Sequence, residues 1–174
     1  MKRIVLIAIL ILFIYMCESS NPEMKKLFNP PFDPNYKFTF LQRFARYVKI
    51  DTTSDPKSKT FPSTMKQLNL SRILVEEMKQ LGIKDAHLDE HGYALGTLES
   101  NSPKKNVPII GLISHVDTSS DVSGTNVRPV MHTFKGEDLK FEGRVIVKAD
   151  ENPELFNYMG QNILTSDGTT LLGL

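Results

Sequence analysis

Residues 107–117, Val-Pro-Ile-Ile-Gly-Leu-Ile-Ser-His-Val-Asp, decide the fold of this chain. The first seven are almost continuously apolar, which predicts a β-strand covered on both faces, as in the centre of an α/β sheet. Polar residues follow at the end of this strand, where open α/β sheets usually bind ligands. Because residues two apart in an extended chain share a face, the side chains of His115 and Asp117 are expected to lie on the same side.

The pair of His115 and Asp117 suits metal binding. A metal-bound imidazole usually donates its other N–H to a carboxylate, which orients the ring and raises its basicity. Taken alone, the tripeptide is better explained as a hydrogen-bonded histidine at a strand end with an aspartate that caps the loop. The chain has one cysteine, so a cysteine zinc cluster and an intramolecular disulfide framework are excluded. Any metal must be held by histidine and carboxylate.

Two amphipathic helices are predicted before this strand. Apolar residues recur every three or four positions over residues 38–50, and again from Leu70 to Leu81. Gly82 is expected to end the second helix. Thr64 and Gln67 match a capping box, which predicts that the second helix begins at Thr64.

Short strands make up the rest of the expected fold. Residues 86–88 and 93–98 are predicted to form a β-hairpin. Weaker strand patterns occupy residues 127–130, 144–147 and 162–165. We therefore expect an α/β fold in which the early helices pack on a mixed sheet.

The N-terminus differs in composition from the remainder. Lys2 and Arg3 precede an apolar run over residues 4–16, which is shorter than the roughly 20 residues of a membrane-spanning helix. This layout is typical of a secretory signal, and Cys17 stands where a lipoprotein signal places its lipidated cysteine. We expect residues 1–17 to be a signal or lipoprotein-like segment, and residues 18–37 to be a polar, Pro-rich tether. The protein is then exported or anchored to a membrane; an uncleaved anchor and a misassigned start are the alternatives.

Composition narrows the function classes. The chain has 174 residues, of which 40% are hydrophobic and 24% charged, so disordered, collagen-like and coiled-coil classes are excluded. Its 21 basic residues nearly balance its 20 acidic ones, for a net charge of +1. Such a balance does not attract a polyanion, so nucleic acid is not an expected partner.

Several further segments occur together in an order that resembles the N-terminal part of peptidase T, a family of zinc-dependent tripeptide aminopeptidases. The resemblance covers roughly residues 41–173. The segments that carry it are residues 43–52, 62–64, 81–82, 88–93, 111–118, 121–124, 126–129 and 165–173. Several motifs in the right order are far more specific than any one of them.

The resemblance implies a site and a reaction. It makes His115 a zinc ligand and Asp117 the neighbouring catalytic acid that orients the site, while the substrate-binding residues stay unknown. The family holds two zinc ions and hydrolyses small peptides with zinc-activated water. Its bridging aspartate, general base and lid domain would follow the residues given, so residues 38–174 are expected to be a truncated N-terminal part of the catalytic domain. The family is typically cytoplasmic, which is the alternative to export.

Other polar residues are expected to have ordinary roles. The histidines outside the motif (His87, His91 and His132) are not expected to be metal ligands. Asp121 is expected to form a turn, and the segment from Asp167 to Thr170 is either a turn or an approach to the metal. An apolar patch around Leu171, Leu172 and Leu174 is expected to be exposed.

Two other functions are compatible with the residues. One is a non-catalytic, exported remnant of a peptidase. The other is a related amidohydrolase that acts on acylated amino acids and shares the arrangement of His115 and Asp117. Because one motif-supported histidine falls short of a four-ligand zinc shell, residues 18–174 alone are expected to bind zinc weakly.

Overall fold

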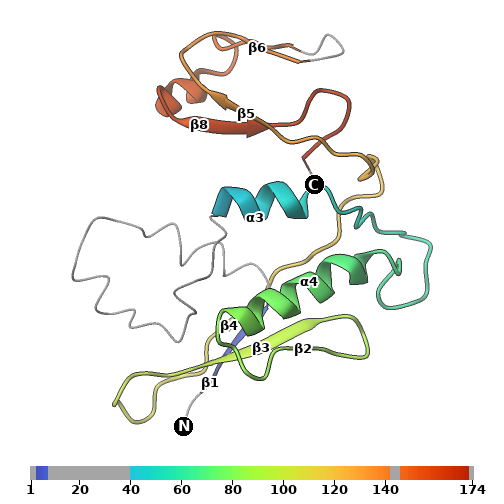
Figure 1. The fold of residues 1–174 in the computed structure, drawn as a ribbon, viewed down its shortest axis with the longest axis vertical. Helices are drawn as coiled ribbons and strands as arrows, with labels where there is room; N and C mark the ends of the chain where they lie inside the picture. The colour runs from blue at the N-terminus through green and yellow to red at the C-terminus, as the bar shows by residue number, and fades with distance from the viewer. Residues whose placement is uncertain (1–2, 8–39, 142–145, 173–174) are drawn as a thin grey trace.

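The structure is a computed structural model that describes residues 3–7, 40–141 and 146–172. Its elements form two groups at opposite ends of the molecule, with α3 between them (Figure 1). The first group holds β1 (Arg3–Ile7), α4 (Gln67–Gln80), β2 (His87–Leu88), β3 (Ala94–Glu99) and β4 (Gly111–Leu112); the helix between the groups is α3 (Phe40–Tyr47). The second holds β5 (Val130–Thr133), β6 (Leu139–Lys140), β7 (Ile146–Val147), the short 3-10 helix η1 (Pro153–Tyr158) and β8 (Asn162–Thr165). The fold is mixed α/β with few helices and small sheets.

The core of the first group lies between α4 and the hairpin. The apolar stripe of α4 is buried as predicted, and its side chains cluster with Ile83, Ala86 and Ala94. At the C-terminal end, the N–H of Gly82 donates to Lys79 O and the N–H of Ile83 donates to Met78 O. These two bonds form a Schellman motif, and Gly82 has the positive φ of +91° that the motif requires. Gly82 therefore ends the helix as expected.

The predicted capping box is wrong. The hydroxyl of Thr64 donates to Thr53 O at 2.8 Å, and the amide of Gln67 donates to Ser63 Oγ at 2.9 Å. The helix begins at Gln67, and no side chain caps it. Its first turn is closed by hydrogen bonds between residues three apart, such as that from the Gln67 N–H to Thr64 O at 3.2 Å. A partner from elsewhere in the chain thus competes successfully for the hydroxyl that the local pattern assigned to the helix.

Helix α3 lies within the predicted range 38–50 and is linked to α4. Glu77 is buried, and its carboxylate accepts a hydrogen bond from the Tyr47 hydroxyl. Arg46 Nη1 lies 2.8 Å from the other oxygen of Glu77. Tyr47 also packs against the apolar cluster of the first group. A buried carboxylate with two such partners holds the two helices together.

The hairpin of β2 and β3 confirms the prediction. Its strands are antiparallel, with His87 opposite Leu95. Asp89 Oδ1 accepts hydrogen bonds from the N–H groups of His91 and Tyr93 and closes the turn. Gly92 completes the turn with a φ of +86°, and a Cβ there would lie 2.7 Å from Leu68 Cδ2. The positive φ therefore favours glycine, whereas the end of the Leu68 side chain can move to admit a Cβ.

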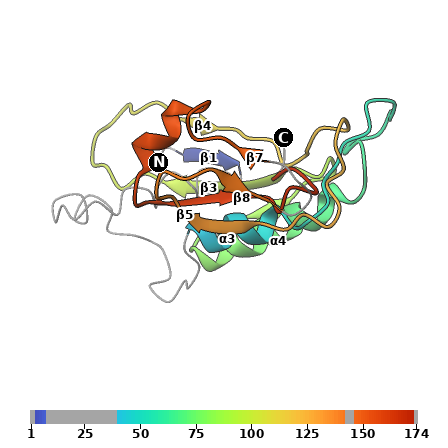
Figure 2. The same ribbon diagram turned by 90° about the horizontal axis from the view of Figure 1, so that it is seen from above.

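The sheet of the first group is mixed, as expected, but residues 107–113 do not form its centre. The strand order is β2-β3-β1-β4, with β1 antiparallel to β3 and parallel to β4. Only Gly111–Leu112 is a strand, and it lies at the margin, away from α4 (Figure 2). Ile109 is 60% exposed and Ile113 is 84% exposed. An apolar run favours burial, but no described element lies where it would cover this one, so the predicted central strand is an exposed edge strand.

The second group has its own core around Phe134, Leu139 and Ala149. β8 matches the predicted strand 162–165, and it pairs with β5 in antiparallel fashion. β5 begins at Val130, where the prediction 127–130 ended; Val127 is buried in the preceding loop, which explains its apolar character. Of the predicted strand 144–147, the structure describes Ile146–Val147 as β7 and leaves 144–145 outside the described residues.

The N-terminal segments are described only in part. Residues 3–7 form β1, between β3 and β4, whereas Cys17 and the expected tether 18–37 lie outside the described residues. In the part of the chain that the structure describes, no helix has the length and apolar character needed to cross a bilayer. Leu171 is exposed as expected and Leu172 is partly buried, while Leu174 lies outside the described residues.

Candidate functional site

His115 and Asp117 lie together beyond the end of β4. The Nδ1 atom of His115 lies 2.8 Å from the main-chain oxygen of Asp117 and 3.1 Å from its Oδ1. With the proton on Nδ1, the ring donates to both oxygens and leaves the lone pair of Nε2 for another partner. The His115 side chain is 74% exposed. The two side chains therefore share a side of the chain, as their spacing predicted.

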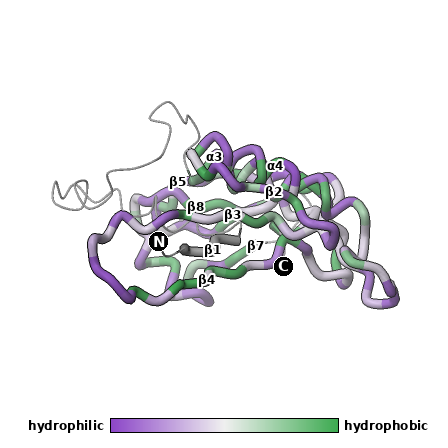
Figure 3. The backbone as a smooth tube through the Cα atoms, turned by 90° about the horizontal axis from the view of Figure 1, so that it is seen from below, coloured by the Kyte–Doolittle hydropathy of each residue, from purple (hydrophilic) through white to green (hydrophobic). Residues whose placement is uncertain are grey.

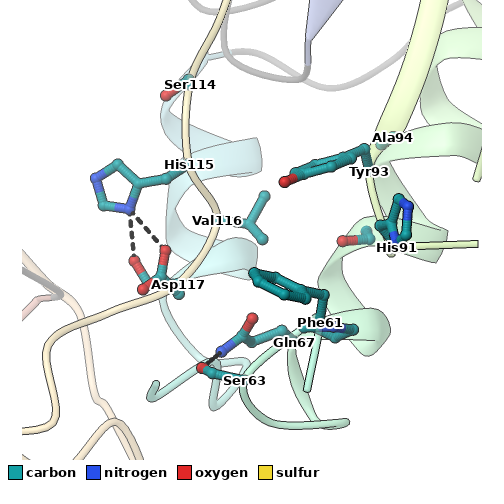
Figure 4. A pocket seen from close by; sticks show the side chains of 13 residues that line it. Phe61, Ser63, Gln67, His91, Tyr93, Ala94, Ser114, His115, Val116 and Asp117 are labelled. Carbon is teal, nitrogen blue, oxygen red and sulfur yellow. Dashed lines mark hydrogen bonds and ion pairs between the residues drawn. The ribbon is translucent and has the colours of Figure 1, made fainter. Parts of the chain in front are cut away.

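The intervening Val116 points the other way. Figure 4 shows its side chain directed toward Phe61 and Tyr93, while His115 and Asp117 project from the opposite side of the segment. Val116 also packs against the apolar cluster of the first group. This contact anchors the segment and turns the imidazole outward.

A pocket of about 230 Å³ lies next to this segment. Its wall includes Phe61, Gln67, His91, Tyr93 and Val116. The rings of Phe61 and His91 meet edge to face, with centroids 6.5 Å apart. Ser114, His115 and Asp117 also line this pocket, although the His115 ring and the Asp117 carboxylate project from the side of the segment opposite Val116 (Figure 4).

The segment that carries the pair is held at its far end by a parallel bridge between Thr53 and Thr118. The N–H of Ser54 donates to Thr118 O at 2.9 Å, and the N–H of Thr118 donates to Thr52 O at 3.3 Å. The residue after Asp117 is thus bonded to the loop that follows α3. This loop, rather than a long strand, positions the pair.

Asp51 organises that loop. Its Oδ1 accepts from both the N–H and the hydroxyl of Thr53, and Lys66 Nζ lies 2.9 Å from the same oxygen. Partial burial alone would raise the pKa of Asp51, but the hydrogen bonds from Lys66 and Thr53 outweigh it and hold the pKa below its usual value. The Gly124 N–H donates to Thr53 Oγ1. Asp51 thereby ties three segments together.

Asp51 and Lys66 received no role from the sequence. The spacing of Asp51 and Thr53 is that of an Asx turn, which could have indicated the local hydrogen bonds. Nothing in the sequence pairs Asp51 with Lys66, because they come from separate elements that meet only in the folded chain.

The described residues fit a metal centre only in part. His115 has a free Nε2, and Asp117 is a carboxylate beside it. Among residues 3–7, 40–141 and 146–172, no group of three or more histidine, cysteine or acidic side chains is placed to hold an ion. A zinc site requires about four ligands. The pair is therefore a fraction of a ligand shell.

The other histidines are not gathered around His115 Nε2. His87 Nδ1 contacts Asp85 O at 2.8 Å, and His132 Nε2 contacts Thr165 Oγ1 at 2.9 Å. His91 lies in the hairpin turn and lines the same pocket as His115 and Asp117. Each has a local structural role.

Asp121 forms a turn, as expected, and Asp167, for which the sequence left a turn and an approach to the metal open, also forms a turn. The N–H of Asp121 donates to Ser119 Oγ, which in turn contacts the Asp121 carboxylate. Asp167 Oδ1 accepts from the N–H and the hydroxyl of Thr169, and these bonds lower the pKa of Asp167. Arg128 Nη1 lies 3.7 Å from its Oδ2.

Comparison with curated proteins finds several relatives of this chain that share one name. No protein-family profile matches the chain. It is 49% identical over 136 residues to "Peptidase T" of Halothermothrix orenii, covering 76% of this chain and 33% of the relative. It is 46% identical over 140 residues to "Peptidase T" of Geobacillus thermodenitrificans, a match that covers 79% of this chain and 34% of the relative.

A third relative, "Peptidase T" of Clostridium botulinum strain Loch Maree, is 48% identical over 136 residues, which cover 76% of this chain and 33% of the relative. The chain thus spans about a third of the length of the curated relatives it matches. The resemblance inferred from the motifs is confirmed over that third: the chain is homologous to a part of peptidase T.

Proposed function

We propose that this chain supplies part of the catalytic domain of a zinc-dependent aminopeptidase that removes the N-terminal residue of tripeptides. The observation that carries the proposal is the 49% identity to a peptidase T over 136 residues. This identity favours the peptidase over an amidohydrolase for acylated amino acids. The partner of the site would be a small peptide.

In this proposal, His115 provides one zinc ligand through Nε2. Asp117 is a positioning residue, because its carboxylate and carbonyl oxygens face Nδ1 and restrict the rotation of the ring. When bound, zinc would polarise the peptide carbonyl and lower the pKa of a coordinated water. The remaining ligands of a two-zinc centre and the general base would come from sequence that corresponds to the unmatched part of the relatives.

The geometry around the pair supports these roles for His115 and Asp117. The imidazole is exposed on the side opposite Val116, where further ligands have room to approach (Figure 4). The bridge from Thr118 to Thr53 holds the backbone next to Asp117, so the pair has a defined position before any metal binds. Export or membrane attachment through residues 1–17, with lipidation at Cys17, is part of the proposal, and a cytoplasmic protein is its alternative. The pairing of Arg3–Ile7 with β3 and β4 favours the alternative, because a removed or membrane-bound segment would not be available to the sheet.

A chimera tests the proposal. The matched third of the Halothermothrix orenii relative is replaced by the matching residues of this chain, and tripeptide hydrolysis and zinc content are measured. We expect turnover with two zinc ions per chain. His115→Ala should remove about one zinc and abolish turnover, and Asp117→Asn should weaken zinc binding by about 10–100-fold.

His87→Ala in the same chimera is the matched control, because the described interactions of His87 are local, with the main-chain oxygen and the carboxylate of Asp85. It should leave zinc content and turnover unchanged. A folded chimera that keeps both zinc ions after His115→Ala would contradict the assigned ligand. A folded chimera without turnover would favour a non-catalytic remnant.

A further inference from the structure

Residues 3–7 hold the sheet of the first group together. β1 pairs with β3 in antiparallel fashion along its whole length and with β4 in parallel, so that Leu6 lies between Gly96 and Leu112. Figure 3 shows β1 between β3 and β4 in the same sheet. The strand order is β2-β3-β1-β4, and among the described residues β4 has no strand partner except β1. Without β1, the hairpin and β4 would not belong to one sheet.

The composition of β1 suits this position, although the segment lies outside the motifs shared with peptidase T. Residues 4–7 are Ile-Val-Leu-Ile, and a strand in the interior of a sheet is typically a continuous run of such residues. The same residues begin the apolar run that has the layout of a secretory signal. The match to the Halothermothrix orenii relative covers 76% of this chain, and the motifs of the family begin at residue 43. This chain therefore completes its sheet with a strand from outside those motifs.

We propose that the space between β3 and β4 is a binding site for an extended apolar peptide, here called the strand site, and that residues 3–7 occupy it as an intramolecular ligand. Such a site recognises the main chain of its ligand. The Thr97 N–H donates to Asp85 Oδ1, on the side of β2. Because successive N–H groups of a strand point to opposite sides, those of Gly96 and Leu98 face β1. The inference requires neither zinc nor peptidase activity.

Two features make β1 a separable ligand. Its pairing with β4 extends over two residues only. Residues 8–39 lie between β1 and α3 in the sequence, so β1 is joined to the remainder of the fold through a long connection. A strand that is tethered in this way has a finite effective concentration at its site, and a free peptide of the same sequence can compete with it.

Occupancy of the strand site acts on His115. This residue follows β4 by three positions, and the bridge from Thr118 to Thr53 holds the far end of the same segment. β1 holds the near end by pairing with β4. The pocket beside His115 continues the space between the two strands, since Ala94 lines it from one side and Ser114 from the other (Figure 4). Loss of β1 should therefore loosen the position of the imidazole.

Val5→Pro in the full chain should empty the strand site, because proline lacks the N–H and disrupts a strand that is paired on both edges. The amides of Gly96 and Leu98 should then exchange about 100-fold faster, and the NMR signals of the His115 ring should change. Val5→Thr is the matched control, since threonine keeps the N–H and the β-branched shape. Exchange in β5 and β8 reports whether the second group is still folded.

A synthetic peptide of residues 1–8, Met-Lys-Arg-Ile-Val-Leu-Ile-Ala, tests whether the emptied site binds a strand. In calorimetric titration it should bind the Val5→Pro chain at one peptide per chain, and it should restore slow exchange at Gly96 and Leu98. The same peptide with proline at its fifth position should not bind. The wild-type chain should bind the free peptide at least about 10-fold more weakly, because its own β1 competes.

A cross-link makes the test independent of the proline variant. Val5 lies opposite Thr97, so Val5→Cys with Thr97→Cys in a Cys17→Ser background should form an intramolecular disulfide on oxidation. Val5→Cys with Leu98→Cys is the control, because neighbouring residues of a strand point to opposite faces and this pair should not cross-link. The cross-linked chain should not bind the free peptide, since its site is permanently filled.

Several results would overturn the proposal. Unchanged exchange at Gly96 and Leu98 in Val5→Pro would show that β1 does not fill the site, and a folded Val5→Pro chain that fails to bind the peptide would show that β1 is not exchangeable. A disulfide between two chains would show that the strand comes from a second copy. If Val5→Pro unfolds the whole chain, the wild type decides: no peptide binding, or binding that the cross-link leaves unchanged, contradicts the proposal. None of these measurements involves tripeptide hydrolysis, so the proposed function stands or falls separately.

Discussion

Thr53 and Thr118 form a parallel β-bridge that joins the loop after α3 to the residue next to Asp117. The hydroxyl of Thr53 donates to Asp51 Oδ1 at 2.7 Å and accepts the N–H of Gly124 at 3.2 Å. The candidate site is therefore held by a polar network centred on Thr53. Substitutions in this network should alter the position of His115 and Asp117, although neither of these residues belongs to the network.

Gly124→Ala should lower the free energy of unfolding by about 1–3 kcal/mol. Its Cβ would lie 2.8 Å from Thr53 Oγ1 and 3.1 Å from Asp51 Oδ1, so the hydrogen-bonded loop would have to shift. Urea denaturation measures the change, and the NMR signals of the His115 ring report whether the shift reaches the site. Gly111→Ala is the control, because its Cβ would meet nothing within 4 Å and it should be neutral or slightly stabilising. Equal losses from both substitutions would contradict the close approach.

Stability should fall as the pH drops below about 4. Asp51, Asp85 and Asp167 each have a folded-state pKa below the usual value of 3.8. For Asp85, as for Asp51, burial would raise the pKa and hydrogen bonds outweigh it; the bonds to Asp85 come from Thr97. A lowered folded-state pKa contributes stability above the unfolded value, and this contribution is lost as the pH falls through the folded value.

Asp51→Asn should therefore flatten the decline of stability between pH 5 and pH 2, while lowering stability at neutral pH. The urea midpoint measured at several pH values tests this. Asp150→Asn serves as the control, because it removes an exposed carboxylate and leaves the network of Asp51 and Lys66 intact. If both variants keep the wild-type pH dependence, Asp51 has no share in it.

Met78 and Met65 provide a matched pair for the core. Met78 is 1% exposed within the cluster of the first group, and Met65 is 67% exposed. Met78→Ala should destabilise by about 2–5 kcal/mol because it leaves a cavity, and Met65→Ala should change stability by less than about 0.5 kcal/mol. Chemical denaturation gives both values. A small loss for Met78→Ala would mean that this core is loosely packed.

The second group should respond separately from the first. Phe134 is buried at the centre of its own cluster. Phe134→Ala should reduce hydrogen-exchange protection in β5 and β8 by an amount equivalent to about 3–5 kcal/mol and leave α4 nearly unchanged. Phe61→Ala is the control, because Phe61 is exposed. Equal loss of protection in α4 would show that the two groups unfold as one unit.

The parts of the fold that the sequence predicted are those encoded over a few residues. The spacing of Leu70, Leu74 and Met78 defines the buried face of α4, and Gly82 ends the helix where a positive φ is needed. The turn that Asp89 closes depends only on its own neighbours. The side that His115 and Asp117 share follows from the period of an extended chain.

The tertiary structure decided which of several available partners each of these side chains contacts. The apolar run 107–113 states a preference for burial, but burial depends on what lies beside it, and among the described residues it lies at an open edge. The hydroxyl of Thr64 could cap a helix or reach Thr53, and only the packed chain favours Thr53. Asp51 meets Lys66 for the same reason. Local hydrogen bonds and periodicity are properties of neighbouring residues, whereas these contacts are determined by how distant segments come together.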